Sequence, residues 1–130
     1  MTMTVEEVLS DRNFKFVTRK KPMYDRIAEL DEDSVFTDVL STTMSIAFAI
    51  GYSVERYDSF SSGTAFLNLS SVPSELTEEL IRLVIIRHPD LDTSSAILTR
   101  INEYAEYGIE ELLRESNRVG RFNIDNFIDP

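Results

Sequence analysis

The stretch VFTDVLSTTMSIAFAI, residues 35–50, decides the fold. Its apolar side chains recur every three or four residues, the spacing that places side chains on one side of an α-helix. The residues of this apolar stripe are Phe36, Val39, Leu40, Met44, Ala47 and Phe48, widened by Ile46 and Ile50. So broad a stripe predicts a central helix that is buried on more than one side. Gly51 follows directly, and because glycine readily adopts the left-handed backbone that ends helices, the helix is predicted to stop there.

Capping residues and apolar spacing predict four further helices. They run from about Val5 to Arg12, from Pro22 to Leu30, from Pro73 to Arg87, and from Asp92–Ser94 either to a break at Gly108 or, if Gly108 is bridged, on to Arg118. Two short strands are predicted at Asn13 to Thr18 and at Ala65 to Leu69. The expected fold is therefore a mainly α domain of about five helices. A two- or three-stranded ribbon formed by the strands is the α+β alternative.

The length and composition fit one small helical domain that spans residues 1–130. A chain of this length hides roughly two-thirds of its unfolded surface on folding, which is enough for one core. The apolar fraction of 42% supplies the material for that core, and the charged fraction of 28% is ordinary for a globular protein.

The chain contains no cysteine, so it has neither a disulfide framework nor a thiolate zinc site. Its first residues carry Glu6, Glu7 and Asp11 in place of the basic start and apolar run of a signal peptide. The longest nearly uncharged stretch, Val39 to Val54, is too short and too rich in serine and threonine to cross a bilayer. A cytoplasmic protein without a membrane partner is therefore expected.

Residues that could carry catalysis are sparse. The one histidine, His88, precedes Asp90 and Asp92, but a metal site needs three or four converging ligands. A helix end with a histidine that favours the helix dipole, followed by an aspartate cap, explains the same residues. The four glycines are isolated, so no phosphate-binding loop exists, and no serine elbow appears. Carboxylates are plentiful, and their spacing places most of them on outer, solvated helix faces; they are Glu75, Glu78, Glu79, Glu103, Glu106, Glu110 and Glu111. The chain is predicted not to be an enzyme and to bind neither a cofactor nor a metal.

The charge is unevenly distributed. Residues 12–26 hold six basic residues and one acid, a net charge of +5, whereas the rest of the chain carries −15 within the total of −10. So acidic a chain disfavours unspecific binding to duplex DNA, because phosphates dominate such affinity. The charge is compatible with a basic protein partner or with a local basic patch read at short range.

The basic segment interleaves cations with aromatic rings, the combination that single-stranded nucleic acids bind. Phe14, Phe16 and Tyr24 are its aromatic residues. The candidate nucleic-acid or anion contacts are Lys15, Arg19, Lys20, Lys21 and Arg26. The alternative is that Phe14 and Phe16 face the core while the cations pair with the abundant acids.

Exposed apolar residues are the second kind of candidate site, because such residues anchor protein interfaces. They are expected in the loop from Tyr52 to Phe66 and in the tail from Phe122 to Ile128, whose apolar spacing predicts docking. The candidate interface residues are Tyr52, Tyr57, Phe60, Phe66, Phe122 and Phe127.

Two blocks of sequence carry a resemblance. Residues 35–52 end in the pair Gly51-Tyr52, and residues 101–109 read INEYAEYGI, followed by Leu112. Together with the helix Pro22 to Leu30, these blocks resemble the Dnd system-associated protein 4 family over about half the chain, in the same order. The chain departs from that family at Ser53-Val54-Glu55-Arg56, where the family is rich in Arg and Lys. It departs again at Glu106-Tyr107-Gly108, where the family favours Asn-Gly-Gly.

Proteins of the family that the chain resembles are encoded near bacterial DNA phosphorothioate modification and restriction genes. The resemblance implies a non-catalytic accessory or adaptor subunit that binds a larger partner in an anti-phage defence or DNA-modification system, and it transfers no catalytic residue. Two alternatives stay open: a nucleic-acid-facing regulatory protein that uses residues 12–26, and an acidic DNA-mimic inhibitor. A homo-oligomer is also left open.

Overall fold

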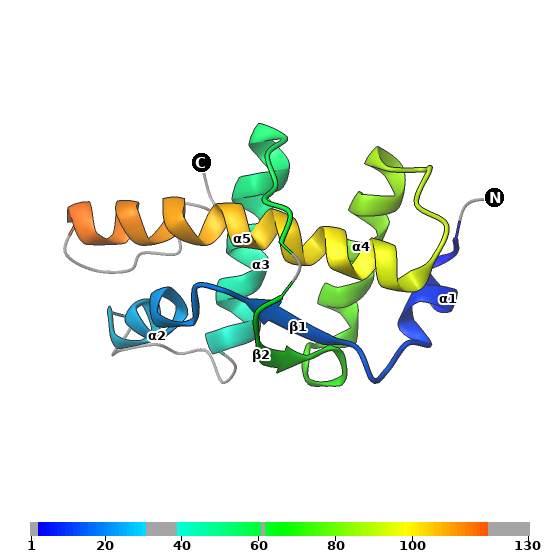
Figure 1. Cartoon of the computed structure of the whole chain (residues 1–130), viewed down its shortest axis with the longest axis horizontal. Coiled ribbons are helices and arrows are strands. Elements are labelled where there is room, and N and C mark those ends of the chain that lie inside the picture. Colours follow the sequence, from blue (N-terminus) through cyan, green and yellow to red (C-terminus); the bar gives the residue numbers. More distant parts are fainter. Residues whose placement is uncertain (1–2, 31–38, 61, 120–130) are drawn as a thin grey trace.

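The computed structural model describes residues 3–30, 39–60 and 62–119 (Figure 1). The described part contains helices α1 (Val5–Leu9), α2 (Lys21–Leu30), α3 (Val39–Val54), α4 (Ser74–Arg87) and α5 (Ser94–Val119), strands β1 (Lys15–Thr18) and β2 (Thr64–Asn68), and the 3-10 turn η1 (Leu69–Ser71). The two strands pair in an antiparallel sheet. The predicted mainly α fold with a small β ribbon is confirmed. Among the described residues, no helix is long and apolar enough to span a membrane.

The fold is organised around α5, which runs along the length of the molecule in Figure 1 and packs against α3. The predicted central helix is buried at Met44, Ala47 and Phe48, and Leu40 is partly buried. Phe36 lies outside the described residues. These α3 side chains join buried residues of α5, of which the largest are Ile97, Leu98, Ile101, Tyr104, Ile109 and Leu112.

The two helical glycines bring α3 and α5 into backbone contact. A Cβ atom added to Gly108 would lie 2.6 Å from the carbonyl carbon of Ala47, and closer still to its oxygen. A Cβ atom added to Gly51 would likewise collide with the backbone of Tyr104 on α5. The prediction that the helix stops at Gly51 is therefore wrong. Gly51 lies inside α3, where the absence of a side chain admits the neighbouring helix.

The end of α3, Val54, lies three residues after Gly51. Glu55 adopts the left-handed backbone with φ 58°. The amide of Glu55 donates to the carbonyl oxygen of Tyr52 (3.2 Å), and the amide of Arg56 donates to that of Gly51 (3.0 Å). These two hydrogen bonds form a Schellman cap, in which glycine usually occupies the position of Glu55.

The other predicted elements differ from the structure mainly at their ends. The first helix ends at Leu9, followed by the C-cap residue Ser10, and does not reach the predicted Arg12. The strands are one or two residues away from their predicted bounds. Gly108 is bridged, so α5 is one continuous helix rather than two. The reason is the same close approach to Ala47, which needs helical backbone without a side chain at that position.

The ribbon lies against α5 through β1. The amide of Val17 donates to Oδ1 of Asn102 on α5 (3.0 Å), and β1 pairs on its other side with β2. The register shifts between Phe16 and Val17, which pair with Leu67 and Ala65, so that Phe66 is an extra residue in β2. One edge of the ribbon is thus held by a helix, while β2 forms the other edge.

Candidate functional site

The corner where β1 leads into α2 is built around a buried carboxylate, Glu106 of α5, which is 1% exposed. Thr18 Oγ1 donates to Glu106 Oε1 (2.7 Å), and the amide of Arg19 donates to Oε2 (3.1 Å). A buried charge is tolerated only when hydrogen bonds or opposite charges compensate its desolvation. Glu106 and Glu103 are both buried, so these two are exceptions to the prediction that most of the helix carboxylates lie on outer faces. None of the other five is buried.

Lys20 belongs to the same corner and points inward. Its Nζ donates to the carbonyl oxygen of Glu106 (2.8 Å) and lies 3.4 Å from a carboxylate oxygen of Glu110 and 3.5 Å from one of Asp58. The Lys20 side chain is only 15% exposed. The middle cation of the basic triplet therefore holds the ribbon to α5 and is largely withdrawn from solvent.

The remaining cations of the basic segment are placed in different ways. Arg19 is 51% exposed, with Nε 3.5 Å from Glu106 Oε2 and its guanidinium 5.1 Å from the ring centre of Phe60. Lys21 pairs with Asp25 on the next turn of α2. Arg26 is exposed on α2 and also has a partner. Lys15, by contrast, is exposed and makes no ion pair with any residue that the structure describes.

The aromatic residues of the basic segment face inward. Phe16 and Tyr24 are buried, and Phe14 packs edge-on against Phe16 with ring centres 5.3 Å apart. Burial, assisted by the nearby Glu106 carboxylate, raises the pKa of Tyr24 well above its ordinary value, so its phenol stays protonated. Rings in the core cannot stack on bases. The arrangement matches the alternative reading, in which aromatic residues fill the core and cations pair with acids.

The predicted interface aromatics are mostly engaged within the chain. Tyr52 donates from its hydroxyl to the carbonyl oxygen of Leu83 (2.9 Å) and carries the guanidinium of Arg87 3.5 Å above its ring centre. Phe66 packs against Tyr24 with ring centres 4.5 Å apart. Tyr57 (39% exposed) and Phe60 lie under the guanidinium groups of Arg100 and Arg19. Phe122 and Phe127 lie outside the described residues. The partner role of all six residues stays a prediction.

His88 caps the end of α4 and joins a polar cluster that sequence reasoning missed. Its Nε2 lies 2.7 Å from the hydroxyl of Tyr104, and Nη1 of Arg100 lies 2.9 Å from its Nδ1. Because arginine can only donate, Nδ1 is the acceptor and Nε2 carries the proton. Partial burial, with Arg100 and Arg87 nearby, lowers the pKa of His88. A neutral imidazole is therefore expected here, rather than the cation that would favour a helix dipole.

No metal site accompanies this histidine in the part of the chain that the structure describes. There, no group of three or more histidine, aspartate and glutamate side chains is arranged to hold a metal ion. The carboxylates closest to the basic corner are already bound to Lys20 and to the backbone amide of Arg19, just after β1.

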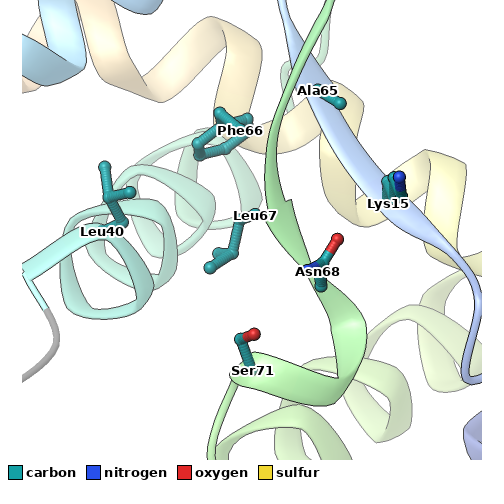
Figure 2. A pocket seen from close by; sticks show the side chains of 7 residues that line it. All are labelled: Lys15, Leu40, Ala65, Phe66, Leu67, Asn68 and Ser71. Carbon is teal, nitrogen blue, oxygen red and sulfur yellow. The ribbon is translucent and has the colours of Figure 1, made fainter.

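An open hollow of about 490 Å³ lies between β2 and the first turn of α3 (Figure 2). Phe66 and Leu67 point from β2 toward Leu40 of α3, and Lys15 of β1 lies across the strand from them. Asn68, Ala65 and Ser71 complete the lining. The hollow thus combines apolar walls, a strand edge and one exposed cation.

The chain matches no protein-family model, no curated protein and no solved structure. Two surfaces then remain on which a function can be argued from the side chains themselves. One is the basic corner around Lys20, whose charges are mostly paired inside the molecule. The other is the hollow along β2, where Lys15 has no ion-pair partner among the residues that the structure describes.

Proposed function

We propose that this chain is a non-catalytic accessory or adaptor subunit that binds a larger protein of a bacterial anti-phage defence or DNA-modification system. The choice of system rests on the resemblance to the Dnd system-associated protein 4 family. The choice of an adaptor rests on how the chain uses its charged and apolar side chains.

The internal use of the basic triplet is the observation that carries the proposal. Lys20 is withdrawn into contacts with Glu106, Asp58 and Glu110, and Lys21 pairs with Asp25. A nucleic-acid surface needs cations that can exchange their counterions for phosphates. Cations already bound to carboxylates are poorly suited to that exchange, so a protein partner is favoured over DNA or RNA.

A complex with a larger protein is the direct test. The chain, tagged and coexpressed with each protein encoded at a phosphorothioate modification or restriction locus, is expected to co-elute with one of them in size-exclusion chromatography. The complex should survive near-physiological salt, and the isolated chain should not shift DNA or RNA under the same conditions. Failure to bind any of these proteins would refute the assignment to such a system.

The nucleic-acid alternative requires its own variant. Lys15→Glu combined with Lys21→Glu reverses the exposed Lys15 and the partly exposed Lys21, and it leaves Lys20 in the corner, so the fold should be preserved. A tight, salt-sensitive DNA shift by the wild-type chain that disappears in this double variant would overturn the adaptor proposal.

Catalytic inertness is tested separately. Nuclease and nucleotide-hydrolysis assays with added magnesium should stay at background, because His88 is hydrogen-bonded to Tyr104 and Arg100 and faces no nucleophile among the residues described. Activity that His88→Ala abolishes would show that the chain is an enzyme.

A further inference from the structure

The outer edge of β2 carries backbone groups that the ribbon does not use. The amide of Leu69 donates to the carbonyl oxygen of Phe14 (3.0 Å), so Leu69 faces β1. Because backbone groups alternate along a strand, the amide of Asn68 points away from β1, whereas its carbonyl belongs to the start of η1. Among the described residues, β1 is the only strand that pairs with β2. Within residues 3–30, 39–60 and 62–119, no other strand occupies this edge, so it can accept one there.

This edge lacks the usual protection against strand addition. Proteins shield exposed edges with charged residues, prolines or a covering helix. The sequence of β2, TAFLN, contains neither a charge nor a proline. The hollow beside it separates β2 from α3, so none of the helices that the structure describes covers this edge (Figure 2).

The walls of the hollow suit an extended chain. Leu40 and Phe66 are partly buried and Leu67 is buried, so they offer apolar contacts, while the strand edge offers hydrogen bonds. An added strand gains affinity from backbone hydrogen bonds and specificity from alternate side chains that enter pockets. A segment with apolar residues at every second position fits both features.

Charge selects among the strands that could bind. Lys15 lines the hollow, is exposed, and has no ion-pair partner in the described part of the chain. An acidic side chain on the incoming strand would meet Lys15, whereas a basic one would be repelled. A second copy of this chain would bring the same uncharged β2 edge and no carboxylate for Lys15 from that strand. A foreign strand fits better.

We propose that the β2 edge binds an extended, acidic segment of the partner protein as a third strand of the ribbon, with a carboxylate of that segment against Lys15. This inference rests on the proposed adaptor function and names the chemistry of its partner. It also identifies β2 and the start of α3 as the docking surface.

Synthetic peptides probe this edge without the partner. The probe is a heptapeptide of alternating valine and threonine that ends in two aspartates, compared with a version that ends in two lysines and a version with a central proline. We expect the aspartate peptide to bind the full chain and to slow hydrogen exchange at the Asn68 amide. The lysine peptide should bind about tenfold more weakly, and the proline peptide should not bind.

Asn68→Pro removes the donor that the added strand would use. Asn68 has φ −81°, close to the value that proline requires, and its amide points away from β1, so the substitution should leave the ribbon intact. Loss of one hydrogen bond predicts about tenfold weaker peptide binding. Asn68→Ala keeps the amide and should bind as the wild type does. Equal binding by Asn68→Pro and wild type would overturn the proposal.

Lys15→Glu tests the charge without touching the backbone. It should reverse the preference, so that the lysine peptide binds more tightly than the aspartate peptide. Arg56→Glu makes the same charge change at an exposed residue just after the C-terminal end of α3, whereas the hollow lies at its first turn. This control should leave the preference unchanged. An unchanged preference in Lys15→Glu would refute the role of that residue.

Other outcomes separate this inference from the adaptor proposal. A partner complex that forms equally well with Asn68→Pro and Lys15→Glu would leave the adaptor in place and refute the edge as its docking surface. Peptide binding at the edge without any partner complex would support the edge as a strand-binding surface and refute the adaptor proposal. A wild-type chain that dimerises, with Asn68→Pro monomeric, would make a second copy the occupant and show that a foreign strand was the wrong choice.

Discussion

Gly108→Ala should destabilise the protein, although the same change in most helices stabilises it. In a helix interior, alanine is favoured over glycine by about 1 kcal/mol. At Gly108, however, the new Cβ would lie 2.6 Å from the carbonyl carbon of Ala47, whereas non-bonded carbon atoms prefer about 3.5–4.0 Å. The two helices would therefore have to separate by about 1 Å. Overpacking of this kind costs typically about 1–3 kcal/mol, and because the obstacle is backbone, we expect the upper end.

The net effect should be a loss of about 2 kcal/mol in the free energy of unfolding. For a chain of this length, that corresponds to a fall in Tm of roughly 6–10 °C. Urea unfolding and thermal melts followed by circular dichroism measure both quantities. Ser95→Ala, an exposed change in the first turn of the same helix, is the control and should stay within about 0.5 kcal/mol of wild type. A Gly108→Ala variant as stable as wild type would show that α3 and α5 do not touch at this glycine.

Four further substitutions test other parts of the structure. Glu106→Gln should cost about 2–3 kcal/mol, because it removes a buried charge bound by two donors, whereas Glu110→Gln at a half-exposed position should cost little in the same urea titration. The pKa of His88 is lower in the folded chain than in the unfolded chain, so the folded chain binds a proton less readily. The stability that neutral His88 contributes is therefore complete above pH 6.5, the unfolded pKa, and is lost as the pH falls toward the pKa of the folded chain. His88→Gln should flatten that pH dependence in melts between pH 5 and 7. Glu55→Gly should raise the free energy of unfolding by up to about 1 kcal/mol, since glycine adopts φ 58° without strain; an unchanged melt would argue against the cap. Phe48→Ala should cost about 3–5 kcal/mol, and a loss below 1 kcal/mol would contradict the central position of α3.

The helices could be predicted because apolar spacing reflects which face is buried, whatever the partner is. The two glycines could not be interpreted from the same pattern. Gly51 and Gly108 are both consistent with a helix end, yet each lies inside a helix that another backbone approaches closely. The distinction depends on which helix packs at that position, and this information is not local. Glu55, where the left-handed turn occurs, is a residue that sequence preferences argue against.

The candidate site was less predictable than the fold, because its contacts join distant parts of the chain. Glu106 looks like a solvated residue on an amphipathic helix, and its burial is explained only by donors from Thr18, 88 positions away, and the adjacent Arg19. The possibility that the basic segment pairs with acids could be foreseen from composition, but not which cation turns inward. The hollow along β2 could not be foreseen, since it exists only after the ribbon and α3 are placed together.

The internal pairing also changes how the uneven charge should act on partners. With Lys20 and Lys21 bound to carboxylates, the basic segment projects less positive field than its net charge of +5 implies, and the chain as a whole keeps its charge of −10. Long-range attraction of phosphates is then weak, so recognition has to rely on short-range contacts. At the β2 edge, added salt would weaken the attraction between Lys15 and an acidic strand, but it would also screen the repulsion of that strand by the rest of the molecule. Because these effects oppose each other, binding at this edge should depend only weakly on salt, in contrast to the steep salt dependence of phosphate contacts.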